Sequence, residues 1–195
     1  MSQQPHRHPM RGRSWRLALA WALVSLVALP AIAADFRVES AKTHLSDDTY
    51  LLDARIHYGF SDLALEALDN GVPLTIEVHL QVRTADAWIW DDNLLDRRMR
   101  YAIRYKPLSE RYLVTQLPGE GGRSFVTRDS AIAALGEIKQ APLIGASSLE
   151  PGGAYEVHIK AELDIEALPL PLRPMAYLRP SWQLSTGWTK WPLEP

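Results

Sequence analysis

Residues 74–83 read LTIEVHLQVR, and this stretch decides the fold class. Apolar side chains occupy every second position from Leu74 to Val82, and polar or charged side chains fill the positions between them. Because successive side chains of a β-strand point to opposite faces, the stretch predicts a strand with one buried face and one solvated face. Strands of this kind are typical of antiparallel sheets.

The same alternation recurs on both sides of this stretch, in residues 51–60, 100–106 and 156–165. A further strand is expected at residues 112–114, and turn signals lie at Asp47-Asp48, Lys106-Pro107, residues 119–122 and residues 151–153. The chain therefore contains many short strands joined by tight turns.

Two helices interrupt the strands. The first is expected to begin after Ser61 and to end at Asn70-Gly71. The second is expected to begin after Thr127 or Asp129, to include Ile138 and to stop before Pro142. The fold class that follows is α+β, with an antiparallel β-sheet or sandwich of about eight strands and two helices.

The order of elements also allows an internal duplication into two ββαβ halves. The closing strands of the two halves would share the sequences EVHL at residues 77–80 and EVHI at residues 156–159. The second half would then need an insertion at residues 142–153. Four matched positions on alternating strands favour this interpretation only weakly, because such strands resemble one another.

Residues 1–33 have the pattern of a secretory signal peptide. Arginines precede an apolar segment at residues 17–29, and Ala31 and Ala33 form an A-x-A cleavage site. Cleavage is expected after Ala33, which would place residues 34–195 in the periplasm as one α+β domain. The alternative is an uncleaved segment that holds the domain at the membrane.

Charge and cysteine content exclude several classes of protein. Four of the 21 basic residues and none of the 23 acidic residues lie in residues 1–33, so cleavage would change the net charge from −2 to −6. An acidic chain of this kind is not expected to bind nucleic acid or an anionic membrane. The sequence has no cysteine, which excludes disulfides, thiol catalysis and a lipid anchor on cysteine.

The segment 167–180 is rich in proline and is expected to cross the surface, because proline cannot continue the interior of a sheet. A last strand is expected around residues 181–189.

The sequence contains none of the common catalytic or phosphate-binding motifs, so we expect no enzyme activity and no cofactor. His79 and His158 each fall on the polar face of a strand. They could approach each other and bind zinc, but a zinc site needs three or four converging ligands, which favours two solvated histidines instead.

A candidate partner or ligand surface consists of Trp88, Trp90, Asp91 and Asp92. The two indoles are two positions apart, so on a strand they would share one face and could stack on a sugar or a peptide. The alternative is that the tryptophans, including Trp182, Trp188 and Trp191, fill the core.

Five motifs occur in order along the chain: residues 60–74 (FSDLALEALDNGVPL), 88–92 (WIWDD), 105–112 (YKPLSERY), 167–172 (ALPLPL) and 181–188 (SWQLSTGW). Together they resemble a family of exported proteobacterial proteins called domain of unknown function 4390, some of whose members are labelled proline-rich signal peptide proteins. The chain departs from this family at residues 88–90, where relatives often show a fuller aromatic run, and at Leu170, where relatives often have lysine.

The resemblance brings no catalytic residues, but it implies a class of partner. Relatives are commonly encoded beside a membrane-bound sensor histidine kinase of the nitrogen-regulation type. The function expected from the sequence is therefore an exported, non-catalytic periplasmic domain that binds a protein of an envelope sensor or membrane system. The alternative is a periplasmic protein that binds a small ligand or glycan on the Trp88–Asp92 surface.

Overall fold

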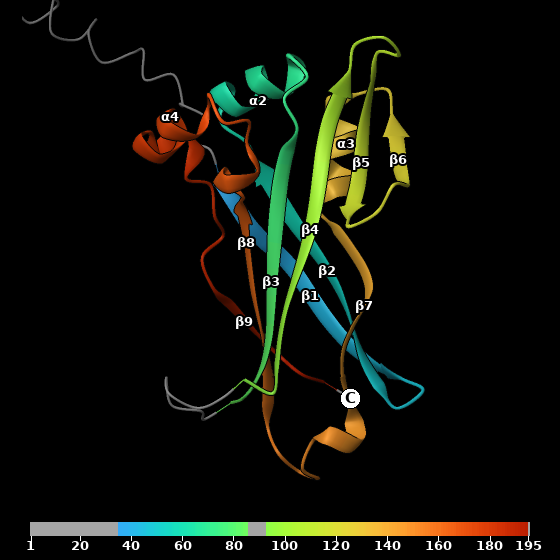
Figure 1. Cartoon of the computed structure of the whole chain (residues 1–195). Coiled ribbons are helices and arrows are strands. Elements are labelled where there is room, and N and C mark those ends of the chain that lie inside the picture. Colours follow the sequence, from blue (N-terminus) through green and yellow to red (C-terminus); the bar gives the residue numbers. More distant parts are fainter. Residues whose placement is uncertain (1–34, 86–92, 195) are drawn as a thin grey trace, which may run out of the picture. The chain divides into compact units, whose positions relative to one another are not determined.

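The computed structural model describes residues 35–85 and 93–194 (Figure 1). In these ranges the chain forms nine strands and three α-helices, with short 3₁₀ turns between some of them. The strands are β1 (Asp35–Ser46), β2 (Thr49–Gly59), β3 (Leu74–Thr84), β4 (Leu95–Lys106), β5 (Arg111–Leu117), β6 (Gly122–Phe125), β7 (Glu137–Gly145), β8 (Tyr155–Leu163) and β9 (Thr189–Pro192). The helices are α2 (Asp62–Asp69), α3 (Arg128–Leu135) and α4 (Arg173–Leu178), and the 3₁₀ turns are η2 (Ala146–Ser148), η3 (Ile165–Ala167) and η4 (Pro180–Trp182).

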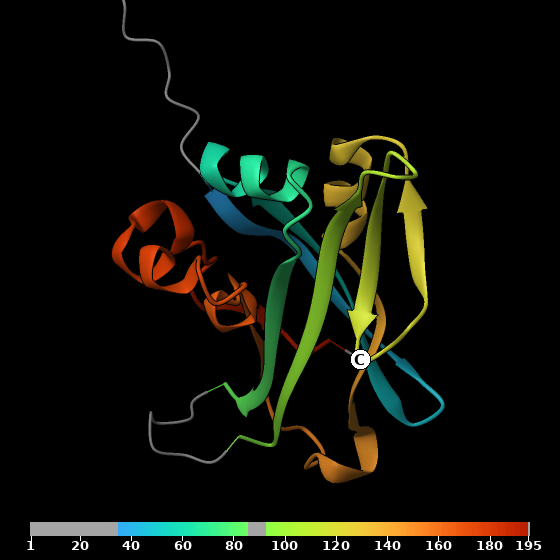
Figure 2. The same ribbon diagram turned by 45° about the horizontal axis from the view of Figure 1, so that its top comes forward.

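The strands form two antiparallel sheets, which confirms the α+β sandwich expected from the sequence. One sheet has the order β1-β2-β7, and the other has the order β6-β5-β4-β3-β8-β9. Buried side chains of both sheets form one continuous core. Figure 2 shows α3 behind β5 and α4 beyond the opposite edge of the larger sheet.

Strand β3 is at the centre of the larger sheet, between β4 and β8. Its alternate side chains from Leu74 to Val82 are fully buried, whereas Glu77, His79 and Gln81 lie on the other face. The alternation that predicted this strand therefore reflects a sheet with one face in the core.

Local signals also place the turns and the starts of the helices correctly. Ser61 caps α2 by accepting a hydrogen bond from Ala64 N, and Thr127 caps α3 by accepting one from Ser130 N. Asp47 and Asp48 have φ angles of 45° and 63° and form the β1–β2 turn. Both residues are of a type that tolerates this left-handed conformation.

The predicted end of the second helix was wrong. Helix α3 ends at Leu135, and Ile138 belongs to β7, which pairs with β2. The carbonyl of Gly136 accepts a hydrogen bond from Ile56 N at 2.9 Å, which ties the chain to β2 at this point. A long-range contact therefore ends the helix where the local sequence would allow it to continue.

The proposed duplication matches the order of the elements, with β6 and β7 added in the second part of the chain. The two strands that would close the halves, β3 and β8, are neighbours in the larger sheet. In contrast, β1 and β2 form the smaller sheet together with β7, so the elements of the first part are divided between the two sheets.

The predicted position of the last strand was also wrong. Residues 180–182 form the η4 turn, and Trp182 is only 2% exposed. Ser185 forms a single bridge with Glu162, and regular pairing with β8 begins at Thr189. Burial of the Trp182 side chain fixes a compact turn where the sequence suggested an extended strand.

Substituting Ser61 with alanine is expected to lower the free energy of unfolding by about 1–2 kcal/mol. The Ser61 hydroxyl accepts from Ala64 N and donates to the Ser181 carbonyl at 2.7 Å, so it both caps α2 and holds the η4 turn. Urea unfolding measures the loss. The control is Ser46→Ala, at an exposed position, which should change the free energy by less than about 0.5 kcal/mol. Equal effects of the two substitutions would contradict the role of the Ser61 hydroxyl in capping α2 and holding the η4 turn.

Candidate functional site

The four residues of the surface predicted from the sequence, Trp88, Trp90, Asp91 and Asp92, lie outside the described residues. The described chain stops at Ala85 after β3 and resumes at Asn93 before β4.

The tryptophans near the end of the chain divide between core and surface. Trp182 is buried and Trp191 is half-buried against the core, but Trp188 is 46% exposed. The core interpretation is therefore right for Trp182, and Trp188 is an exposed indole that the sequence did not separate from the others.

Trp188 lies against the two histidines that the sequence placed on polar strand faces. Its ring centroid is 4.9 Å from that of His79 and 6.5 Å from that of His158. His79 is on β3 and His158 is on β8, and the adjacent pairing of these strands brings the two imidazoles to one part of the sheet. The two histidines therefore lie against one indole. The preferred interpretation, two solvated histidines, was wrong, because the His79 side chain is 13% exposed and His158 is 8% exposed.

Each imidazole is bonded to a carboxylate. His79 Nε2 is 2.7 Å from Asp96 Oδ1, and His158 Nε2 is 3.1 Å from Glu156 Oε2. Within residues 35–85 and 93–194, no group of three or more possible metal ligands lies close enough to hold an ion. Two separate histidine–carboxylate pairs therefore lie beside the indole of Trp188.

Burial and neighbouring groups shift the pKa values of Asp96 and His158. Burial disfavours the charged form of Asp96, but hydrogen bonds with His79 and Gln81 outweigh this and lower the pKa of Asp96. Burial lowers the pKa of His158, and its hydrogen bond with Glu156 opposes the shift, whereas Lys190 and Arg83 add to it. Because its folded-state pKa is below the unfolded value, His158 favours folding above the unfolded pKa, and this contribution is lost as the pH falls.

Substituting Lys190 with glutamine is expected to raise the pKa of His158 towards its ordinary value, because a nearby positive charge is removed. An NMR titration of the His158 imidazole measures the shift. Lys139→Gln is the control, since Lys139 is on β7 in the other sheet. An unchanged or lower pKa in Lys190→Gln would show that Lys190 does not act on this imidazole.

A second surface is formed by apolar side chains of the proline-rich segment and α4. We call it the α4 surface, and it consists of Leu170, Met175, Tyr177 and Leu178, which are 73%, 41%, 50% and 82% exposed. Figure 1 shows α4 beside α2, at the end of the sheets opposite the η2 turn.

The segment that carries the α4 surface is anchored to the domain. Leu168, Ala176 and Trp182 are buried, at 1%, 0% and 2% exposure. Arg173 Nε donates to the Leu168 carbonyl at 2.7 Å, and Gln183 Nε2 donates to the Tyr177 carbonyl at 3.1 Å. The exposed apolar side chains are therefore held on a fixed backbone.

The described residues define a two-sheet α+β domain with a fixed apolar surface and a separate histidine–tryptophan cluster. The chain belongs to the family described as a domain of unknown function, DUF4390, whose sequence profile matches residues 33–192. The resemblance carried by the five sequence motifs is thus confirmed. Comparison with curated proteins and with solved structures gave no match. In residues 35–85 and 93–194, no helix is long and apolar enough to cross a bilayer.

Proposed function

We propose that this chain is an exported, non-catalytic domain that binds a partner protein of the cell envelope through the α4 surface. The observation that carries the proposal is the exposure of four large apolar side chains on an anchored segment. Exposed apolar side chains that gather on one part of a protein are a common mark of interaction sites, and these four lie within residues 170–178.

The chemistry of the α4 surface suits a protein partner. Tyrosine and methionine are enriched in protein interfaces, and arginine is also favoured there. Arg173 and Arg179 flank the apolar positions of α4, and Arg173 also pairs with Glu166 at 3.6 Å. Because the backbone is already fixed, binding would lose little conformational entropy, which favours affinity.

Three further elements of the proposal come from the sequence and from its family. The pattern of residues 1–33 supports export. The family context supports a membrane-bound sensor histidine kinase as the class of partner. The lack of catalytic motifs supports a binding role, since no nucleophile, base and orienting group can be named together.

The test is affinity capture from solubilised cell envelopes of cells that express the protein. The wild-type protein and the double variant Tyr177→Ser/Leu178→Ser are compared as baits. The double substitution is expected to reduce recovery of a membrane-anchored protein at least about tenfold, the loss typical of central interface residues. Leu108→Ser is the control, because Leu108 is fully exposed on the β4–β5 turn.

The captured protein must also recover the chain when it is itself used as bait. Equal recovery with the wild type and the double variant would contradict a role for the α4 surface. An equal loss with Leu108→Ser would show that the effect is not specific to that surface.

A further inference from the structure

A hollow of about 550 Å³ lies on the outward face of the smaller sheet, across β1, β2 and β7. Its volume is in the range of small-ligand sites. The four residues of the α4 surface are not part of its lining, so the hollow is a separate feature of the domain. The polar side chains that line it include Ser40, Lys42, Asp53, Arg55, Glu137 and Gln140.

A β-bulge shapes the β7 side of the hollow. The register of β2 and β7 shifts between Leu52 and Ala54, where β7 has one residue more than β2. Gln140 takes a left-handed conformation there, with a φ angle of 50°, and its N–H donates to Asp53 Oδ1 at 2.9 Å. Glycine or asparagine would adopt this conformation with less strain. Bulges often redirect a side chain beside a binding site, and this one places Gln140 in the lining of the hollow.

Neighbouring groups already hold both carboxylates of the lining. One Asp53 oxygen accepts the backbone hydrogen bond at the bulge, and the other lies 3.5 Å from His44 Nδ1. Glu137 Oε2 lies 3.1 Å from Lys139 Nζ and 3.7 Å from Arg123 Nη1. The hydrogen bond with Lys139 lowers the pKa of Glu137 although burial opposes the shift, so this carboxylate is charged and its charge is balanced at neutral pH.

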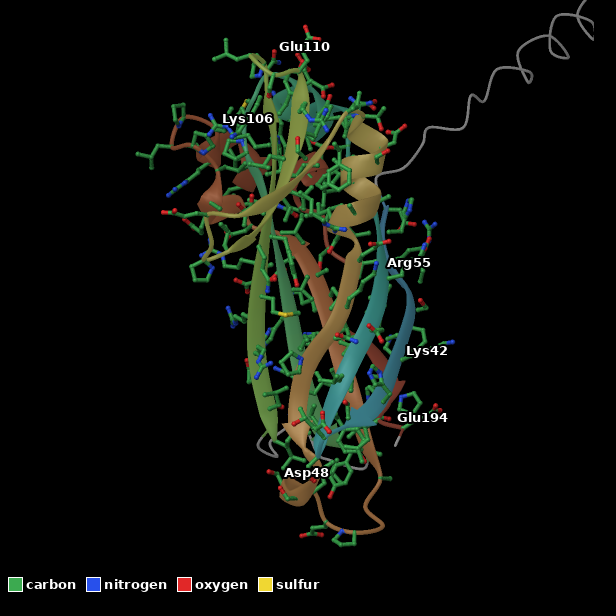
Figure 3. The ribbon with its side chains drawn as sticks, turned by 90° about the vertical axis from the view of Figure 1, so that its right-hand side faces the viewer. Lys42, Asp48, Arg55, Lys106, Glu110 and Glu194 are labelled. Atoms are coloured by element: carbon green, nitrogen blue, oxygen red, sulfur yellow. The ribbon has the colours of Figure 1, made fainter. Side chains whose placement is uncertain are left out.

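Lys42 and Arg55 are the cations of the lining that remain. Lys42 is directly opposite Asp53 in the register of β1 and β2, yet the two side chains form no ion pair. Arg55 is opposite Glu137 and helps to lower its pKa, also without an ion pair. Within residues 35–85 and 93–194, neither cation has a hydrogen-bond or ion-pair partner for its side chain. Both side chains are exposed, and Figure 3 shows them on the same side of the domain.

Two neighbouring positive charges match a phosphate monoester, whose charge is about −1.5 to −2 at pH 7. A guanidinium binds phosphate oxygens through two parallel hydrogen bonds, and an ammonium adds a point charge. The Ser40 hydroxyl and the Gln140 amide of the same lining can donate to further phosphate oxygens. A carboxylate has one charge and two oxygens, so it would leave one of the two cations without a partner.

We propose that this hollow binds a phosphate group between Lys42 and Arg55, with further hydrogen bonds from Ser40 and Gln140. The group belongs either to a phosphate monoester of a small molecule or to free inorganic phosphate. The volume of the hollow favours the monoester, because free phosphate would fill only a small part of it.

The test is an NMR titration of the purified protein with glycerol phosphate, inorganic phosphate and glycerol, each at neutral pH and the same ionic strength. We expect glycerol phosphate to bind with a dissociation constant below about 1 mM and to shift the backbone amides of the strands that line the hollow. Binding about tenfold tighter than that of inorganic phosphate would assign the monoester, and equal or weaker binding would assign free phosphate. Binding of neither phosphate below about 1 mM, or equal shifts with glycerol, would overturn the site.

Variants locate the phosphate within the protein. Lys42→Gln and Arg55→Gln are each expected to weaken binding of glycerol phosphate about tenfold, since each removes a charge-assisted contact. Arg55→Lys should weaken binding less, because the charge stays and only the two parallel hydrogen bonds are lost. Because the side chains are exposed, these variants should unfold at the same urea concentration as the wild type.

Lys106→Gln is the matched control. Lys106 is also an exposed lysine, without an ion pair in the part of the chain that the structure describes, and it lies at one end of the larger sheet (Figure 3). Undiminished binding in both Lys42→Gln and Arg55→Gln, or an equal loss in Lys106→Gln, would contradict the location. Since Tyr177→Ser/Leu178→Ser should bind glycerol phosphate as the wild type does, failure of this proposal can be distinguished from failure of partner binding.

Discussion

Substituting Leu80 with alanine is expected to lower the free energy of unfolding by about 2–5 kcal/mol. Leu80 is fully buried on β3, and its pairs on the neighbouring strands are Arg97 of β4 and Ile159 of β8. Truncation would remove three carbon atoms from the closed core between the two sheets. Since surrounding strands are held on both sides by hydrogen bonds, they can collapse into the space only in part, and a cavity remains.

Urea unfolding of the purified protein measures this loss, and the slope of the transition should stay unchanged. Leu108→Ala is the matched control, because the same atoms are removed from a side chain that is fully exposed. The control should change the free energy by less than about 0.5 kcal/mol. A loss below about 1 kcal/mol for Leu80→Ala would mean that β3 is not at the centre of a packed core.

Substituting Gly136 with alanine is expected to cost about 3 kcal/mol, at the upper end of what overpacked sites cost. A Cβ atom at this position would lie 2.0 Å from the carbonyl oxygen of Ile56. That oxygen belongs to the backbone of β2, so no side-chain rotation relieves the clash. The substitution would separate β2 from the α3–β7 junction and strain the hydrogen bond from Ile56 N to the Gly136 carbonyl.

The control for this substitution is Gly121→Ala. A Cβ atom at Gly121 meets nothing within 4 Å. The free energy of unfolding of Gly121→Ala, measured in urea, should therefore differ from that of the wild type by less than about 0.5 kcal/mol. If Gly136→Ala were as stable as the wild type, the close approach of β2 to the start of β7 would be wrong.

The parts of the fold that depend on local patterns could be predicted from the sequence. Alternation in residues 74–83 identified β3 because one face of that strand is in the core and the other carries polar groups. Capping side chains at Ser61 and Thr127 marked the starts of α2 and α3, since each satisfies a backbone N–H that the helix leaves free.

The parts of the fold that depend on contacts between distant residues could not be predicted from the sequence. The sequence AIAALGEIK at residues 131–139 is compatible with a continuing helix, and only the close approach of Gly136 to Ile56 ends α3 and starts β7. Burial of Trp182 likewise determines the chain path before β9. The neighbouring Ser181 carbonyl accepts a hydrogen bond from Ser61, which is distant in the sequence.

The candidate site shows the same division. The alternation of β3 and β8 allowed His79 and His158 to be placed on polar faces, and the pairing of these strands then brought them together. The α4 surface was not predicted, because whether Leu170, Tyr177 and Leu178 face solvent depends on Ala176 and Trp182 docking inward. A run of large apolar residues between prolines, where no sheet can continue, is the signal that could have indicated it.

Figure 3 shows Lys106 and Glu110 at one end of the larger sheet and Asp48 at the other end of the domain. Leu108 and Leu45, exposed apolar residues near these two positions in the sequence, therefore provide two controls that are far apart from each other.

The most direct test of partner binding is photo-crosslinking in cells that carry the chain, with a photoreactive amino acid at Leu178 and, in separate strains, at Leu108 and Leu45. If the α4 surface binds the partner, we expect one abundant adduct with a membrane-anchored envelope protein from position 178. We expect little or no adduct from the two control positions, although all three side chains are exposed. Mass spectrometry of the adduct identifies the partner. No protein adduct from position 178 in correctly exported, folded protein, or equal adducts from all three positions, would contradict the account.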